Sequence, residues 1–125
     1  VGRPTSCNGS TVQCGNASVP ESAILTTGCA RCFDFSDASL SETMRRLSRY
    51  KKVRMIGCAG LALAWTAGGM MDLYREENIF LWDVAAGIAL VEAAGGHATF
   101  TPIDGQWRTT VTAGSPSLVA TEHAC

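Results

Sequence analysis

Asp83 is the residue whose type and position most directly suggest chemistry. Its carboxylate stands alone between Trp82 and a long run of apolar and small residues that stops at Gly95-Gly96. An Asp at the start of a helix caps it by accepting the free backbone N–H groups of the first turn. Because helix starts lie at the surface, a lone carboxylate there can also bind a hard metal ion through oxygen. The pattern fits both interpretations, a helix cap and a metal ligand.

Two cysteines, Cys29 and Cys32, have the spacing of a metal-binding or redox pair. Zinc would require a second pair of ligands at a comparable spacing, which neither the wide Cys7 to Cys14 gap nor the two distant histidines supply. We therefore interpret the pair as structural. The six cysteines as a set indicate mostly reduced thiols, because small secreted disulfide scaffolds are denser in cysteine and less apolar.

Six of the ten basic residues gather in residues 45–54, where they could attract phosphate groups. A helix that ends here would use the same charges in another way, because basic side chains complement the negative end of the helix dipole. Only Tyr50 interleaves with them, so nucleic-acid binding is not expected. The six residues are Arg45, Arg46, Arg49, Lys51, Lys52 and Arg54.

The elements that must position these residues alternate between strands and helices, which indicates an α/β fold. The central helix is expected over residues 83–96, with Asp83 as its N-cap and Gly95 beyond its last turn. Glu92 is the only charged residue inside it, so we expect burial on most sides. Asn8-Gly9 predicts a small hairpin. Further strands are expected at 21–27, 53–56, 70–75, 97–101 and 109–113, and further helices at 36–50, 61–67 and from Ser115-Pro116 onward.

These signals predict one domain over residues 1–125, built as a mixed sheet of about five strands with helices on both faces. A hydrophobic content of 46% is typical of a globular protein. A net charge of −1 creates no electrostatic field that would favour nucleic-acid or membrane partners. No apolar run is long enough to span a bilayer, and the start of the sequence has no signal-peptide pattern. A cytoplasmic location is therefore expected.

The stretch from Trp82 to Gly96 resembles a signature of the inositol monophosphatase family. Residues 82–87 and 92–96 are similar to the family pattern W-D-x-A-A-G…E-A-x-G-G. In that family the Asp of the signature is a metal ligand, so the resemblance implies that Asp83 binds Mg²⁺. The resemblance covers about residues 8–120 and implies the C-terminal half of the family's fold.

The loop after the expected strand at 53–56 resembles the family pattern R-x-x-G-[ST]-A-A, whose backbone and small side chains contact substrate. Arg54, Gly57 and Ala59 match it, while Cys58 replaces the usual Ser or Thr and Gly60 replaces the second Ala. The resemblance thus implies Gly57, Cys58 and Ala59 as substrate-binding residues. From the residues alone, the small side chains would indicate tight packing between a helix and the sheet.

Glu76 lies in a stretch similar to the family pattern D-x-[YF]-x-E, seven residues before Asp83. In the family, the Glu at this spacing holds a substrate hydroxyl. A carboxylate suits that task because it accepts hydroxyl hydrogens in charge-assisted bonds. Without the resemblance, Glu76 and Glu77 would be interpreted as a solvated pair.

Residues 101–106 resemble the family's first metal motif, D-P-[IL]-D-G-[TS], only in part and at a different place in the chain. Thr101 replaces the first acid and Gln106 the hydroxyl residue, and the stretch follows the second motif instead of preceding it. We therefore predict a hairpin turn here and do not assign Asp104 to metal.

The resemblance implies a phosphoric monoester hydrolase in which bound Mg²⁺ activates water and neutralises the leaving oxygen. The family's other metal ligands come from motifs upstream of the signature, so only Asp83 of that set is present. The chain is therefore expected to be inactive alone and to act with a missing N-terminal half or as a homodimer. Its substrate would be a small phosphorylated metabolite: an inositol or sugar monophosphate, histidinol phosphate or a nucleotide phosphate.

A second class of function stays open. The chain could be a non-catalytic, standalone domain that keeps the fold for oligomerisation or for binding anions. In either case, an exposed apolar sheet face or edge is expected where a partner would dock.

Overall fold

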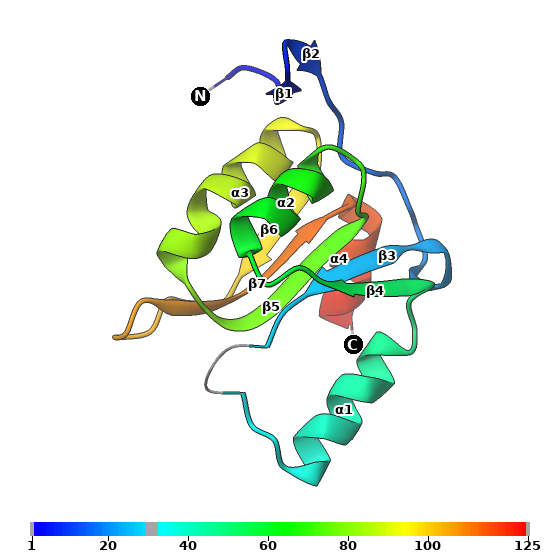
Figure 1. Cartoon of the computed structure of the whole chain (residues 1–125), viewed down its shortest axis with the longest axis vertical. Helices are drawn as coiled ribbons and strands as arrows, with labels where there is room; N and C mark the ends of the chain where they lie inside the picture. Colours follow the sequence, from blue (N-terminus) through cyan, green and yellow to red (C-terminus); the bar gives the residue numbers. More distant parts are fainter. Residues whose placement is uncertain (1, 30–32, 125) are drawn as a thin grey trace.

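The structure is a computed structural model that describes residues 2–29 and 33–124 (Figure 1). Its centre is a five-stranded sheet of β3 (Ile24–Thr27), β4 (Lys52–Met55), β5 (Leu73–Phe80), β6 (His97–Phe100) and β7 (Arg108–Gly114). The strand order is β4-β3-β5-β7-β6. β3 runs parallel to β4 and β5, whereas β7 runs antiparallel to β5 and β6. The expected mixed sheet is therefore confirmed.

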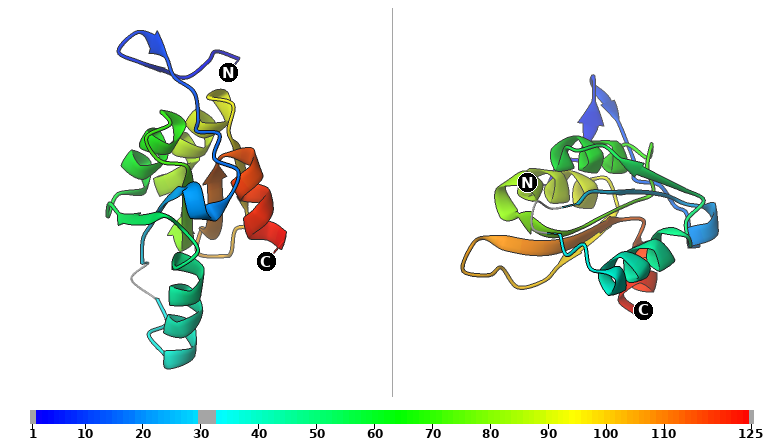
Figure 2. Two further views of the ribbon diagram at one scale, coloured as in Figure 1. Left: turned by 90° about the vertical axis from the view of Figure 1, so that its right-hand side faces the viewer. Right: turned by 60° about the horizontal axis from the view of Figure 1, so that its bottom comes forward.

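Helices cover both faces of this sheet, as expected (Figure 2). α2 (Ala59–Ala67) and α3 (Leu81–Ala93) lie on one face and α4 (Pro116–Ala124) on the other, while α1 (Asp37–Leu47) projects beyond the sheet on the side of α4. The core under α2 and α3 includes Leu63, Tyr74, Val84, Val91 and Val111. The core on the opposite face includes Leu25, Tyr50, Leu73, Leu118 and Val119.

A short hairpin of β1 (Ser6–Cys7) and β2 (Ser10–Thr11) precedes the sheet, followed by the 3-10 turn η1 (Pro20–Ser22). Asn8 and Gly9 have φ angles of 51° and 83°. Positive φ at both central residues is the geometry that favours Asn-Gly in two-residue hairpin turns. The hairpin predicted from this dipeptide is confirmed.

α3 differs from the expected helix at its start. Phe80 is the N-cap, and Asp83 is the third helical residue and makes no capping hydrogen bond. The prediction that Asp83 caps the helix is therefore wrong. The C-terminal end is as expected, since Gly95 follows the last turn with a φ of +84°.

α3 also exposes more of its surface than expected. Only Val84, Gly87 and Val91 of the helix are buried. The opposite side, which we call the open face of α3, is exposed and mostly apolar, with the exposed Glu92 at its margin. It consists of Trp82, Ala85, Ala86, Ala89, Leu90 and Ala93. Exposed apolar side chains lie on this helix and also on the two edge strands of the sheet, where Met55 of β4 and Phe100 of β6 are exposed.

β5 is longer than the predicted strand and leads directly into α3. It continues to Phe80, and its pairing with β7 shifts register between Glu76 and Ile79, where Asn78 has a φ of +56°. Side chains alternate along the strand, so Tyr74 joins the core under α2 and α3, while Leu73 joins the opposite core. Glu76 has the parity of Tyr74 and therefore faces the side that carries α3.

None of the helices in the described ranges is both long and apolar enough to cross a membrane. The four described cysteines that are free thiols are Cys7, Cys14, Cys29 and Cys58. Cys32 and Cys125 lie outside the described residues, so the interpretation of Cys29 and Cys32 as a structural pair stays a prediction.

Candidate functional site

A cleft of about 350 Å³ lies where β3 and β4 end and α2 and α3 begin. In an open α/β sheet, ligands bind outside the carboxyl ends of the strands. Every predicted site residue lines this cleft, although these residues come from three separate segments. The lining residues are Gly28, Cys29, Gly57, Cys58, Ala59, Gly60, Glu76, Ile79 and Asp83.

Glu76 is held in the cleft by two neighbours. The Tyr74 hydroxyl donates a hydrogen bond of 3.0 Å to Oε2 of Glu76. On the other side, a Cβ atom on Gly28 would lie only 2.5 to 2.7 Å from the carboxylate atoms of Glu76. Glycine at position 28 therefore makes room for the carboxylate. Oε1 is left without a hydrogen bond from the described residues.

The electrostatic surroundings of Glu76 disfavour its charged form. Burial raises the pKa of the Glu76 carboxyl, the Tyr74 hydrogen bond partly offsets this increase, and the negative charge of Asp83 adds to it. Burial also raises the pKa of Tyr74, and the nearby Glu76 and Asp83 raise it further. Tyr74 is therefore a permanent hydrogen-bond donor, and the three side chains form one electrostatic cluster.

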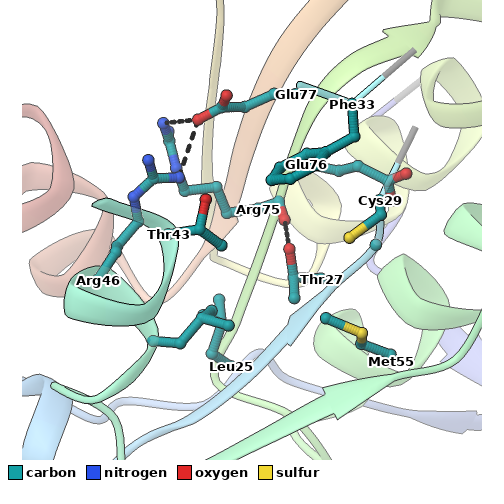
Figure 3. Close-up of a pocket in the computed structure, with 12 residues that line it drawn as sticks. Leu25, Thr27, Cys29, Phe33, Thr43, Arg46, Met55, Arg75, Glu76 and Glu77 are labelled. Atoms are coloured by element: carbon teal, nitrogen blue, oxygen red, sulfur yellow. Dashed lines mark hydrogen bonds and ion pairs between the residues drawn. The ribbon is translucent and has the colours of Figure 1, made fainter. Parts of the chain in front are cut away.

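Glu76 and Glu77 do not form a solvated pair. Glu77 accepts hydrogen bonds from Arg46 and Arg75, at 2.8 and 2.9 Å. Figure 3 shows this arrangement, with Glu77 directed toward the two arginines and Glu76 toward Cys29. The Thr27 hydroxyl donates to the Arg75 carbonyl at 2.5 Å, which fixes the backbone just before Glu76.

Asp83 is exposed and lines the cleft, in the first turn of α3. Within residues 2–29 and 33–124, no hydrogen bond or ion pair engages its side chain. A carboxylate with no protein partner at the mouth of a cleft is available to a ligand. The cation-ligand interpretation of Asp83 is thus compatible with its surroundings, whereas the capping interpretation is not.

The start of α2 forms the side of the cleft that would meet an anion. Gly57 turns the chain with a φ of +74°, and Cys58 is the N-cap but makes no side-chain capping bond. The first turn of α2 contains no acidic residue. The first backbone N–H groups of a helix lack intrahelical partners and carry a partial positive charge. Such an end favours negatively charged ligands.

The other predicted sites have structural roles. Asp104 accepts backbone hydrogen bonds from Gln106 and Arg108, at 2.8 and 2.9 Å, and so stabilises the hairpin turn predicted there. Half of the basic cluster is paired with carboxylates: Arg45 with Glu42, Arg46 with Glu77 and Arg49 with Glu122. Among the described residues, Lys51, Lys52 and Arg54 make no ion pair, and Arg54 donates to the Val53 carbonyl.

Gly28 and Tyr74 line or support the site, although the sequence patterns assigned neither of them a role in it. Gly28 follows a parallel strand directly, and this position alone would have marked it as a lining residue of the ligand crevice. Tyr74 precedes Glu76 by two residues, so the side-chain alternation of a strand places both on one face. The contact between Gly28 and Glu76 links two different strands, so no pattern within a short stretch of sequence indicates it.

The described residues do not complete a Mg²⁺ site. They contain no group of three or more His, Cys, Asp or Glu side chains that could hold a metal ion. The cleft has two carboxylates, those of Glu76 and Asp83. Mg²⁺ prefers six oxygen ligands in octahedral geometry, some of them water or substrate phosphate. Asp83 fits as one ligand of such a site, and the remaining protein ligands must come from elsewhere.

Replacing Glu76 should change the pH dependence of stability. The folded-state pKa of Glu76 is raised above its unfolded value of about 4.5, so the folded state binds more protons between these two values. Stability is therefore lost as pH rises from about 4.5 through the raised pKa. Glu76→Gln can still accept the Tyr74 hydrogen bond but carries no charge, so it should be more stable than the wild type at neutral pH.

Urea denaturation of both proteins at pH 4 and pH 7.5 would measure this effect. The difference between Glu76→Gln and wild type should be larger at pH 7.5. Glu77→Gln is the matched control, because its carboxylate is paired with arginines and its removal should lower stability slightly at neutral pH. Equal differences for Glu76→Gln at the two pH values would contradict the described surroundings.

Comparison with known proteins places these features in context. Residues 1–124 match the family described as the inositol monophosphatase family. Over 80 residues, the chain is 35% identical to an inositol-1-monophosphatase from Caulobacter vibrioides, an alignment that covers 63% of the chain and 31% of that protein.

Solved structures have a similar fold. The inositol monophosphatase from Anabaena has a TM-score of 0.78 at 28% identity, covering 94% of this chain and 48% of that one. The extragenic suppressor protein suhB from Bartonella henselae also has a TM-score of 0.78, at 26% identity, covering 91% of this chain and 45% of that one. The chain thus spans less than half the length of these relatives.

Proposed function

The chain belongs to the inositol monophosphatase family, and we propose that it takes part in the Mg²⁺-dependent hydrolysis of phosphate monoesters. In this proposal it supplies the substrate-binding side of the active site and one metal ligand. The observation that carries the proposal is the convergence of Glu76, Asp83 and residues 57–59 on one cleft. The substrate class is a small phosphorylated metabolite with free hydroxyl groups.

Glu76 would bind a hydroxyl group of the substrate. Its Oε2 is occupied by the Tyr74 hydroxyl, so Oε1 is directed to the ligand and its orientation is fixed. A bond from a substrate hydroxyl to this carboxylate is charge-assisted. The backbone at Gly57, Cys58 and Ala59 would bind the polar atoms of the same molecule, because the start of α2 offers unpaired N–H groups. Together these contacts orient the substrate relative to Asp83.

Asp83 would hold Mg²⁺ together with residues that this sequence does not contain. Bound Mg²⁺ in such enzymes lowers the pKa of an attacking water and neutralises the leaving oxygen. The contribution of this chain to that step is a carboxylate kept free of protein partners and placed across the cleft from Glu76. The completed active site requires a further protein segment.

The open face of α3 is where such a segment would dock. It presents Trp82, with 63% of its surface exposed, and Leu90, with 39% exposed, among four alanines. Exposed apolar surface of this kind marks an interaction site. The face and the cleft share one end of the helix, since Trp82 and Asp83 both lie in the first turn of α3. A segment that packs on this end of the face and extends past it would reach Asp83.

A reconstitution experiment tests the proposal. Hydrolysis of inositol 1-phosphate with Mg²⁺ would be measured for this chain alone and after addition of an N-terminal half from a family member, such as the Caulobacter vibrioides enzyme. We expect no activity from either part alone and Mg²⁺-dependent activity from the mixture. Trp82 should become buried at the same time, which would shift the tryptophan fluorescence to shorter wavelength.

The two readouts separate docking from catalysis. A fluorescence shift without activity for any of several phosphate monoesters would favour a non-catalytic domain that uses the open face for assembly. Neither a shift nor activity would contradict the proposed docking. Leu90→Glu is the matched variant for the interface, because it should prevent docking while leaving the cleft residues in place.

A further inference from the structure

We propose that Cys29 and Cys58 form an oxidisable thiol pair that can be joined by a disulfide across the cleft. Both side chains line the cleft, and both are exposed free thiols in the structure. They come from different segments, Cys29 from the end of β3 and Cys58 from the start of α2. Reversible oxidation of a thiol requires solvent access and is favoured by a second thiol nearby.

The sheet brings the two thiols to the same edge. β3 and β4 are neighbouring parallel strands, and Thr27 and Met55 are their last paired residues. Cys29 follows Thr27 by two residues and Cys58 follows Met55 by three. Neighbouring strands lie about 4.8 Å apart, and a disulfide joins residues whose Cα atoms are about 4.4 to 6.8 Å apart. The two segments therefore leave the sheet one strand spacing apart, which lies within the Cα range of a disulfide.

Gly57 gives the loop before Cys58 room to adjust. Its φ of +74° is a turn conformation, and no atom lies within 4 Å of the position that a Cβ would take. The loop is therefore not packed against other residues at the side-chain position of Gly57. Glu76 reaches the Cys29 side of the cleft, since a Cβ at Gly28 would lie 2.5 Å from its Oε2.

A peroxide is the chemical class of oxidant that would drive the reaction. One thiol sulfur attacks a peroxide oxygen, which forms a sulfenic acid and releases water or an alcohol. The second thiol then attacks the sulfenic sulfur, the S–S bond forms, and water leaves. Both sulfurs are oxidised and the O–O bond is reduced, so atoms and electrons balance. A low-molecular-weight thiol reverses the bond by exchange.

The disulfide would tie the start of α2 to the segment that makes room for Glu76. Its effect on catalysis rests on the proposed function, because residues 57–59 would then no longer be free to bind a substrate. The formation of the disulfide itself does not depend on that function. The remaining described cysteines are placed differently: Cys7 lies on the β1–β2 hairpin, and Cys14 is half-buried near Gly96.

Peptide mapping tests the pair directly. The whole chain would be treated with hydrogen peroxide, its free thiols alkylated under denaturing conditions, and the protein digested with trypsin without reduction. Cleavage after arginine and lysine separates Cys29, Cys32 and Cys58, which fall in peptides 1–31, 32–45 and 55–75. We expect two of the six thiols to escape alkylation, and peptides 1–31 and 55–75 to be linked.

Single cysteine substitutions identify the two residues that form the link. The link should persist in Cys7→Ser, Cys14→Ser and Cys32→Ser and be lost in Cys29→Ser and in Cys58→Ser. Dithiothreitol should reverse it. A link between 1–31 and 32–45 in place of the expected one, or irreversible oxidation of Cys58 alone, would overturn the proposal. Because this readout involves no phosphate ester, it is independent of the reconstitution experiment.

Discussion

Asp83→Asn is expected to lower the Mg²⁺-dependent phosphatase activity of the reconstituted enzyme by about 10³-fold. The proposed metal site would lose one of its charged oxygen ligands, and metal-based charge stabilisation is worth several kcal/mol in such reactions, with about 1.4 kcal/mol for each factor of ten. The measurement is the initial rate of phosphate release at several Mg²⁺ concentrations. Higher Mg²⁺ should restore part of the activity, because the variant would bind the ion more weakly.

Asp104→Asn is the matched control for this substitution. Asp104 also lies in a stretch that resembles a metal motif, but its carboxylate stabilises a turn and does not line the cleft. Its replacement should leave Mg²⁺-dependent activity within about twofold of wild type, since Asn keeps an oxygen that can accept the turn hydrogen bonds. A comparable loss of activity in both variants would contradict the assignment of Asp83.

Thermodynamic stability distinguishes the two roles considered for Asp83. A residue that caps a helix costs about 1 kcal/mol of stability when replaced. Asp83 makes no capping bond, so Asp83→Asn should lower the free energy of unfolding of the chain by only about 0.5 kcal/mol, the value of a charge near a helix start. Loss of activity without loss of stability is the pattern expected for a metal ligand.

Gly87→Ala is expected to lower the free energy of unfolding by about 2 kcal/mol. A Cβ at this position would lie 2.5 Å from both Cβ and Cδ1 of Leu63, so α3 would have to move away from α2 along their shared surface. Alanine would gain about 1 kcal/mol of helix propensity over glycine. Overpacking should outweigh this gain. The Cβ atom of Leu63 is attached to the backbone of α2, so no change of the Leu63 rotamer can move it away.

Gly60→Ala is the corresponding control in α2. No atom lies within 4 Å of the position that its Cβ would occupy, and its backbone is not in the left-handed region. The same substitution should therefore raise the free energy of unfolding by about 0.5 to 1 kcal/mol. Urea denaturation of both variants measures the difference. A Gly87→Ala protein as stable as wild type would show that α2 and α3 are not packed as described.

The sequence allowed the fold class and the sheet to be predicted because the elements are short and clearly punctuated. Glycines mark the ends of several of them, and apolar runs alternate in length between strand and helix. The N-cap of α3 was predicted three residues too late, at Asp83 in place of Phe80, because β5 continues directly into the helix and its last residue serves as the cap. The sequence has no signal for a strand that turns into a helix without a loop.

The site was predictable residue by residue only through the family resemblance. Asp83 and Glu76 are ordinary acidic residues on pattern grounds, and Gly57 could equally serve packing. What the residues alone could not give is the contact between Gly28 and Glu76, since it depends on the pairing of β3 with β5 across 48 positions of sequence. The exposure of α3 was also mispredicted, because an apolar helix normally has neighbours on every side and the described chain supplies them on only one.

The direct passage from β5 into α3 has a consequence for how this protein can evolve. Six residues separate Glu76 from Asp83, and the segment contains a register shift at Asn78 and no loop that could absorb extra length. Inserting or deleting one residue would carry Asp83 about 100° around the helix axis relative to the strand. Substitutions in this segment should be tolerated far more readily than insertions or deletions. The length of the segment should therefore vary less among homologues than its amino-acid composition.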